Sequence, residues 1–161
     1  MMARWLPEVG AVKWAAAIVV FASLLLLSGC ATKPALEPPD GFAEYTGGEA
    51  ARAVSPEGVA LSVRWVENEP EQSLSFWRDA LRTHLERSGY GLLSEDEFEA
   101  PAGPGVRFEW MAPVGAEDWI YMTAVVNAGA RLAVGEAAGP AELYRSHREA
   151  IAQSLETIGR D

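Results

Sequence analysis

Four stretches predict the main strands of a β-sheet: residues 59–66, 106–112, 118–127 and 130–137. Hydrophobic and polar residues alternate in the first two and in the last. The third is apolar on both faces, as expected of a central strand covered on both sides. Short turns join the last three strands, so we expect them to pair antiparallel. Shorter extended pieces are predicted at residues 42–45, 50–55 and 90–93.

Two other stretches repeat hydrophobic residues at helical spacing and predict amphipathic helices at residues 73–88 and 141–158. The apolar stripe of the first consists of Leu74, Trp77, Leu81 and Leu85, and that of the second of Tyr144, Ile151, Leu155 and Ile158. Ser73 is a suitable N-cap, and Gly89 a suitable stop. An antiparallel β-sheet flanked by two amphipathic helices is an α+β fold.

The first 30 residues have the pattern of a bacterial lipoprotein signal peptide. Arg4 and Lys13 precede an uncharged run of 14 residues, 14–27. A membrane-spanning helix needs about 20 apolar residues, whereas the core of a signal peptide needs only about 7–15. The run ends in Leu27-Ser28-Gly29-Cys30, which resembles the lipobox that signal peptidase II recognises. We therefore predict removal of residues 1–29; an uncleaved anchor helix is the alternative.

Cys30 would then carry the acyl chains, such as palmitate, that hold the protein at the membrane. Residues 30–41 contain several prolines and predict a stiff tether that lifts the domain from the membrane. A single α+β domain is expected at 42–161. Position 31 is Ala rather than the Asp that retains enterobacterial lipoproteins in the inner membrane. This favours the outer membrane, with the domain facing the periplasm.

Composition and charge narrow the functional classes. The chain has 161 residues, is 49% hydrophobic and carries a formal charge of −10, which argues against nucleic acid as a partner. Its one cysteine excludes a disulfide framework and a cysteine-based zinc cluster. The 132 residues left after cleavage have 11 basic and 22 acidic residues, a charge of −11. An anionic bilayer would repel such a domain, so attachment must come from the lipid.

Several sequence phrases resemble proteins of the PsbP-like (PsbP/Mog/DcrB-type) fold over residues 42–159. They are Val54-Ser55-Pro56-Glu57-Gly58-Val59, Phe76-Trp77, the passage 132–139 from strand to helix, and Ile151 with Ser154-Leu155. The resemblance implies an αβα sandwich and a non-enzymatic binding or assembly role. It implies no cofactor, and it transfers no functional residue to this chain.

The titratable residues give weak candidates for chemistry. His84 and His147 lie beside the apolar stripes of the two helices, so we expect boundary side chains packed against the sheet; a general base or metal ligand is the alternative. Glu95, Asp96, Glu97 and Glu99 form the densest acidic segment. We interpret it as a solvated loop that could contact a partner or a cation. It lacks the spacing of a calcium loop, and no metal site is predicted.

Four tryptophans of the expected domain are predicted mostly as core: Trp65, Trp77, Trp110 and Trp119. Trp119 follows an acidic turn and is the most suitable partner anchor, and Tyr121 shares its strand face. The sequence contains no Gly-x-Ser-x-Gly elbow, P-loop or dinucleotide motif.

The sequence therefore predicts a lipid-anchored envelope protein whose domain is a non-catalytic accessory, assembly or protein-binding module. One alternative is a small envelope hydrolase that uses the carboxylates at 95–99 or His147. Another is a lipoprotein that binds a small apolar ligand between the sheet and a helix.

Overall fold

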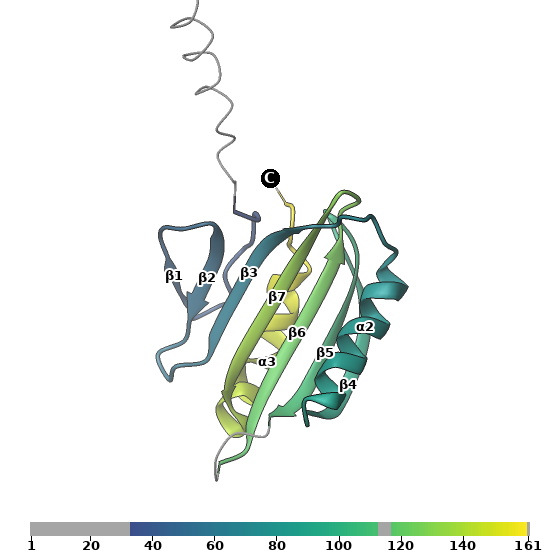
Figure 1. Cartoon of the computed structure of the whole chain (residues 1–161). Helices are drawn as coiled ribbons and strands as arrows, with labels where there is room; N and C mark the ends of the chain where they lie inside the picture. Colours follow the sequence, from purple (N-terminus) through teal and green to yellow (C-terminus); the bar gives the residue numbers. More distant parts are fainter. Residues whose placement is uncertain (1–32, 113–116, 161) are drawn as a thin grey trace, which may run out of the picture. The chain divides into compact units, whose positions relative to one another are not determined.

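Seven antiparallel strands form one sheet in the order β1-β2-β3-β7-β6-β5-β4 (Figure 1). The computed structural model describes residues 33–112 and 117–160, so the predicted signal peptide, the lipobox and Cys30 lie outside the described residues. The strands are β1 (Ala43–Tyr45), β2 (Ala50–Val54), β3 (Ala60–Glu67), β4 (Gly91–Ala100), β5 (Gly103–Ala112), β6 (Trp119–Asn127) and β7 (Arg131–Pro140).

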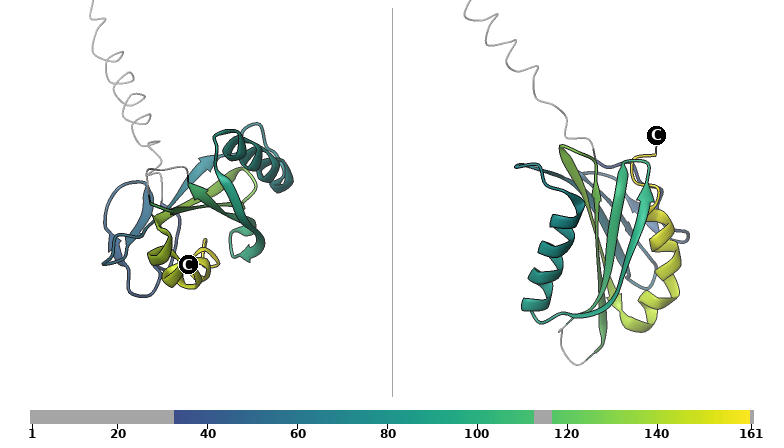
Figure 2. Two further views of the ribbon diagram at one scale, coloured as in Figure 1. Left: turned by 90° about the horizontal axis from the view of Figure 1, so that it is seen from below. Right: turned by 90° about the vertical axis from the view of Figure 1, so that its right-hand side faces the viewer.

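Two helices cover opposite faces of this sheet, α2 (Leu74–Arg87) and α3 (Ala141–Leu155) (Figure 2). Ser73 caps α2 as predicted, because its side chain accepts a hydrogen bond from the Phe76 amide at 3.3 Å. The predicted α+β fold class is confirmed. The last helix is shorter than expected and ends at Leu155.

The expectation that residues 94–99 form an acidic loop is wrong. The predicted short strand at 90–93 extends to Ala100 as β4, the edge strand beside β5. Charged residues are common on edge strands, where they discourage pairing with other chains. Here they also alternate between the two faces of the sheet, and arginines on both sides neutralise them.

Each face of the sheet has its own hydrophobic core. The core beneath α3 includes Leu61, Val63, Ile120, Met122, Tyr144, Ile151 and Leu155. The core beneath α2 includes Leu85, Val106, Phe108, Trp110, Val125 and Leu132. The alternation along β5, β6 and β7 divides their side chains between the two cores.

Glycine lets α3 approach the sheet closely. A Cβ on Gly135, in the middle of β7, would lie 3.0 Å from a methyl group of Leu155. Gly103 opens β5 with φ of +143°, and a Cβ there would collide with the backbone carbonyl oxygen of Asn127. The second contact fixes the β4–β5 turn against the end of β6.

Part of the predicted tether lies on the domain. The Ala35 carbonyl accepts a hydrogen bond from the Gly159 amide at 3.0 Å. The Glu37 amide donates to the Thr157 hydroxyl at 2.9 Å, and the Ser154 hydroxyl donates to the Glu37 carbonyl. Leu36 packs against the core beneath α3. This segment is therefore fixed to the C-terminal end of α3 and to the turn that follows it.

Candidate binding groove beside α2

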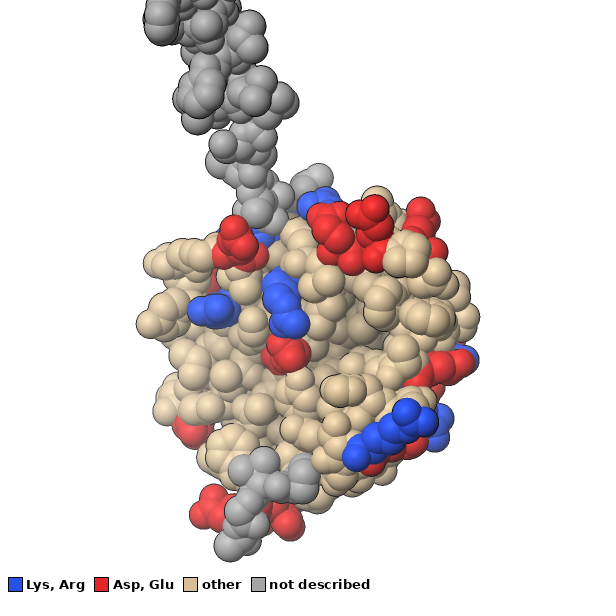
Figure 3. Space-filling model, viewed as in Figure 1, with Lys and Arg blue, Asp and Glu red and all other residues tan. Residues whose placement is uncertain are grey.

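An open groove of about 450 Å³ lies between α2 and the sheet. It exists because α2 packs over β5 and β6, whereas the sheet continues through β7 to β3. Its apolar lining consists of Val66, Trp77, Ala80, Leu81, Leu85, Val125, Leu132 and Val134. Its polar lining consists of Arg64, His84, Tyr121, Thr123 and Glu136. The face drawn in Figure 3 contains this groove and carries few charged side chains at its centre.

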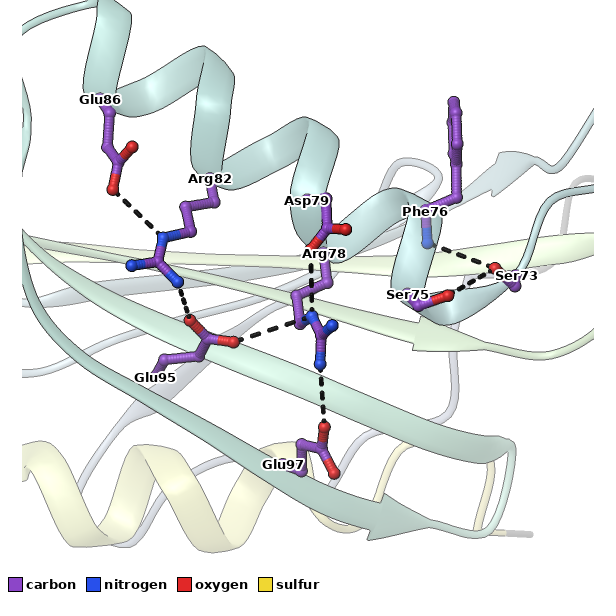
Figure 4. A network of polar contacts seen from close by, with 9 residues as sticks. All are labelled: Ser73, Ser75, Phe76, Arg78, Asp79, Arg82, Glu86, Glu95 and Glu97. Atoms are coloured by element: carbon purple, nitrogen blue, oxygen red, sulfur yellow. Dashed lines mark hydrogen bonds and ion pairs between the residues drawn. The ribbon is translucent and has the colours of Figure 1, made fainter.

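A ladder of ion pairs holds α2 on the side away from the groove (Figure 4). Arg78 contacts Glu97 at 3.3 Å and Glu95 at 3.8 Å. Arg82 contacts Glu95 at 3.1 Å and Glu86 of its own helix at 3.2 Å. Glu95 and Glu97 therefore position one wall of the groove rather than forming a free acidic surface.

A buried asparagine fixes the first turn of α2. The Asn68 Oδ1 accepts hydrogen bonds from the Trp77 indole at 2.8 Å and from the Gln72 amide at 3.1 Å. Its Nδ2 donates to the carbonyls of Gly129 at 2.8 Å and Gln72 at 3.1 Å. The side chain uses all of its hydrogen-bonding groups. It thereby ties the β3–α2 connection to the β6–β7 turn.

The polar part of the groove is centred on Glu136. The Tyr121 hydroxyl donates to its Oε1 at 2.6 Å, and Arg64 Nη1 contacts its Oε2 at 2.6 Å. Burial of Glu136 opposes ionisation, but these two hydrogen bonds and the arginine charge together lower its pKa. Burial and the adjacent carboxylate raise the pKa of Tyr121 above its usual range. The carboxylate is therefore ionised and the phenol neutral at pH 7.

A second polar cluster lies beneath α3, around Glu109. Its Oε1 accepts hydrogen bonds from Arg148 Nε at 2.7 Å and the Tyr144 hydroxyl at 3.2 Å. The Ser94 hydroxyl donates to Oε2 at 3.2 Å. Burial, followed by the charge of Glu109, raises the pKa of Tyr144 above its usual range. The hydrogen bond with Glu109 also raises the pKa of Arg148.

This cluster holds α3 on the sheet. A cavity of about 420 Å³ adjoins it, but its carboxylate is paired on both oxygens. In the described part of the chain, every buried side-chain nitrogen and oxygen has a hydrogen-bond partner. Glu109 is therefore a structural carboxylate, and the α2 groove is the better candidate site.

The two histidines lie on different faces. The expectation that His84 packs against the sheet is wrong, since it is exposed and lines the outer rim of the groove. His147 is half-buried: its Nε2 is 3.1 Å from Glu57, and its ring contacts the edge of Phe42. A backbone hydrogen bond, the Ser55 hydroxyl and His147 lower the pKa of Glu57. The structure does not bring the histidines together.

The predicted acidic cluster is also divided. Glu95 and Glu97 face α2, whereas Asp96 faces the other side of the sheet, 3.9 Å from Arg107.

Among residues 33–112 and 117–160, no group of three or more metal-ligating side chains could hold an ion. No helix within the same described ranges is long and apolar enough to span a membrane.

The predicted tryptophans differ in burial and in location. Trp110 is fully buried, and its indole donates to the Thr123 hydroxyl at 3.0 Å. Trp119 is half-buried at the start of β6, outside the groove lining. Tyr121, on the same strand face, lines the groove.

Three residues of these clusters were not predicted from the sequence as candidate site residues: Arg64, Glu136 and Glu109. The strand pattern contained a signal for the two carboxylates, because Glu109 and Glu136 interrupt strands that lie inside the sheet. A carboxylate there requires hydrogen-bond donors, and the spacing of Tyr144 and Arg148 places both on one face of α3.

Comparison with known proteins supports the fold. A scan against protein-family models found no match, and a search of curated proteins also found none. One similar solved structure is a protein of unknown function from Pseudomonas aeruginosa, described as a candidate regulator. It has a TM-score of 0.51 and 10% identity, and the match covers 73% of this chain and 95% of that one.

A second similar structure is the cyanobacterial PsbP (CyanoP) of Synechocystis. Its TM-score is 0.50 and its identity 10%, with 81% of this chain and 94% of that one covered. The described domain therefore has a PsbP-like α+β fold, as the sequence resemblance predicted. At this identity the likeness concerns the fold alone.

Proposed function

We propose that this chain is a lipid-anchored envelope protein whose domain is a non-catalytic binding module. The groove beside α2 carries the proposal, because it is the site where a partner could bury apolar side chains at little cost. Its floor includes the buried residues Leu85, Val125 and Leu132, and its rim includes the exposed Val66 and Ala80. Apolar pockets with a few fixed polar groups are typical binding sites.

The partner that fits this groove best is a protein segment with apolar side chains. The groove is open along one side, and Val66 exposes 37% of its surface there. One polar cluster of the groove, the ionised Glu136 with Arg64 and Tyr121, would fix the register of the segment. The cleaved chain has a charge of −11, so acidic partners are repelled least at a surface such as this one, which has few charged side chains.

The anchor is proposed from the sequence. Cys30 would carry the lipid after cleavage at the Leu27-Ser28-Gly29-Cys30 motif, with the domain on the periplasmic side and the outer membrane favoured. Labelling cells with a clickable palmitate tests this part. The full-length protein should incorporate the label, and the Cys30→Ala variant should not.

A chemical cross-linking experiment in living cells tests the binding role. The tagged full-length protein is cross-linked and purified beside the variants Ala80→Arg and Thr83→Arg. Both residues are exposed on α2, but only Ala80 lines the groove. A protein partner that is lost with Ala80→Arg and retained with Thr83→Arg supports the proposal. Equal recovery in both variants, or recovery of no partner, contradicts it.

A small apolar ligand is the second candidate, because about 450 Å³ falls within the usual range of small-molecule pockets. Native mass spectrometry of the protein purified from its membrane distinguishes the two. A bound small molecule, displaced by Ala80→Arg, would favour this candidate. The hydrolase alternative would require substrate turnover, abolished by substitution of His147 or of a carboxylate in β4.

A further inference from the structure

We infer that one end of the domain, formed around Ala35, Ala102, Gly129 and Gly159, is the surface that faces the membrane. This inference rests on the proposed lipid at Cys30. We call this surface the anchor end. Hydrogen bonds connect its parts: Ala35 pairs with Gly159, Ala102 with Ile158, and Asn68 with Gly129.

The length of chain between the lipid and the domain carries the argument. Ala35 and Glu37 are hydrogen bonded to the turn after α3, and Pro34 is buried. Four residue steps separate Cys30 from Pro34, and a fully extended chain covers at most about 14 Å in that length. The sequence had suggested a tether as far as residue 41 that lifts the domain. Because the chain from Pro34 onward is fixed to the domain, only about a third of that length remains as a free connection after Cys30.

The opposite end of the domain is much farther from Pro34, because the neighbouring Ala35 is hydrogen bonded to Gly159 at the anchor end. Strand β7 begins beside the β6–β7 turn at the anchor end and has ten residues, which span about 33 Å. Its far end leads directly into α3 at Ala141. A lipid on Cys30 can therefore reach the bilayer easily only from the anchor end.

The anchor end lies against the membrane without inserting into it. Glu67 and Glu69 flank Asn68 there, and acidic side chains gather at that end of the face drawn in Figure 3. Anionic headgroups repel such a surface. The groove beside α2 starts near this end, at Trp77, Val66 and Leu132. Its partner segment would therefore belong to a protein that is itself close to the bilayer.

The test measures energy transfer from the domain to the membrane. The lipidated full-length protein is purified with a single added cysteine, either Ala130→Cys at the anchor end or Glu142→Cys near the start of α3. Both positions are exposed. Each is labelled with a thiol-reactive donor and inserted into phosphatidylcholine vesicles that contain a headgroup-labelled acceptor. An intact mass counts the labels, because a lipid thioether at Cys30 leaves only the added thiol reactive.

Quenching should be at least about twofold stronger for Ala130→Cys than for Glu142→Cys, because the length of β7, roughly 33 Å, separates them. Insertion of about twenty Gly/Ser residues after Ala31 should reduce this difference to near unity, since such a linker is flexible. Thr157→Val, which removes the acceptor for the Glu37 amide, should weaken the difference.

The possible outcomes distinguish a failure of the proposed lipid anchor from a failure of the proposed orientation. Two labels on the protein would mean that Cys30 is free, and the proposed lipid anchor would fail. One label with equal quenching at both positions, or stronger quenching at Glu142→Cys, would overturn the inference while leaving the anchor intact. A difference that persists with the long linker would also overturn it, because the short connection would then not orient the domain.

Discussion

The Tyr121 hydroxyl donates a 2.6 Å hydrogen bond to the carboxylate of Glu136 on the neighbouring strand. The two side chains lie on the sheet face beside α2, and Arg64 of β3 completes the cluster from the other side of β7. This cluster places an ion pair and a phenol within a largely apolar groove. It gives the proposed binding site both polarity and a fixed geometry.

Tyr121→Phe should lower the free energy of unfolding by about 1–2 kcal/mol, because it removes a hydrogen bond to a charged, half-buried group. Urea unfolding measures the change. Tyr45→Phe is the matched control, since Tyr45 is 65% exposed. Equal stability of Tyr121→Phe and the parent protein would contradict the assigned hydrogen bond.

The contribution of Glu136 should depend on pH. Its pKa is lower in the folded protein than in the unfolded chain. The ionised form therefore stabilises the fold above the unfolded pKa, about 4.3, and this stabilisation is lost as the pH falls below that value. Glu136→Gln should be less stable than the parent at pH 7, and the difference should shrink by pH 3. A difference that is constant over this range would contradict the assignment.

Arg148→Met should destabilise the protein by about 2 kcal/mol, because Glu109 is nearly buried and would lose its cation. Glu109→Gln combined with Arg148→Met should cost clearly less than the sum of the two single changes. A double-mutant cycle from urea unfolding measures this coupling. Strict additivity would show that the ion pair does not hold α3 on the sheet.

Gly103→Ala should cost at least about 3 kcal/mol, because its methyl group would collide with the backbone of Asn127 as well as strain the chain. Gly129→Ala provides the control. Gly129 also has positive φ, at +77°, but a Cβ there would meet nothing within 4 Å. Its cost should be about 1 kcal/mol. Similar losses for the two variants would contradict the close approach at Gly103.

The sequence predicted most of the fold from local patterns. The alternation around Val59, Leu61 and Val63 and the stripe of Leu81 and Leu85 define strand and helix directly. The pattern failed at β4, because the run of carboxylates from Glu95 to Glu97 resembles a loop. Arginines that are distant in sequence, on α2 and on β5, neutralise these carboxylates and make a strand favourable there.

The candidate site was harder to predict, because it depends on where α2 lies across the sheet. The sequence shows that Leu81 faces a sheet but not that α2 leaves β3 and β7 partly uncovered. Tyr121 was singled out because it shares a strand face with Trp119, and it does line the groove. Its partners Arg64 and Glu136 come from two other strands, and only the sheet order brings them together.

Site-specific photo-cross-linking tests the central claim most directly. A photoreactive amino acid is placed at Val66 or Ala80, on the two walls of the groove, and at Gln153, an exposed position on α3. In living cells, we expect the lipidated protein to form the same protein adduct from Val66 and from Ala80, and none from Gln153. No protein adduct at either groove position, or the same adduct from Gln153, would contradict the account.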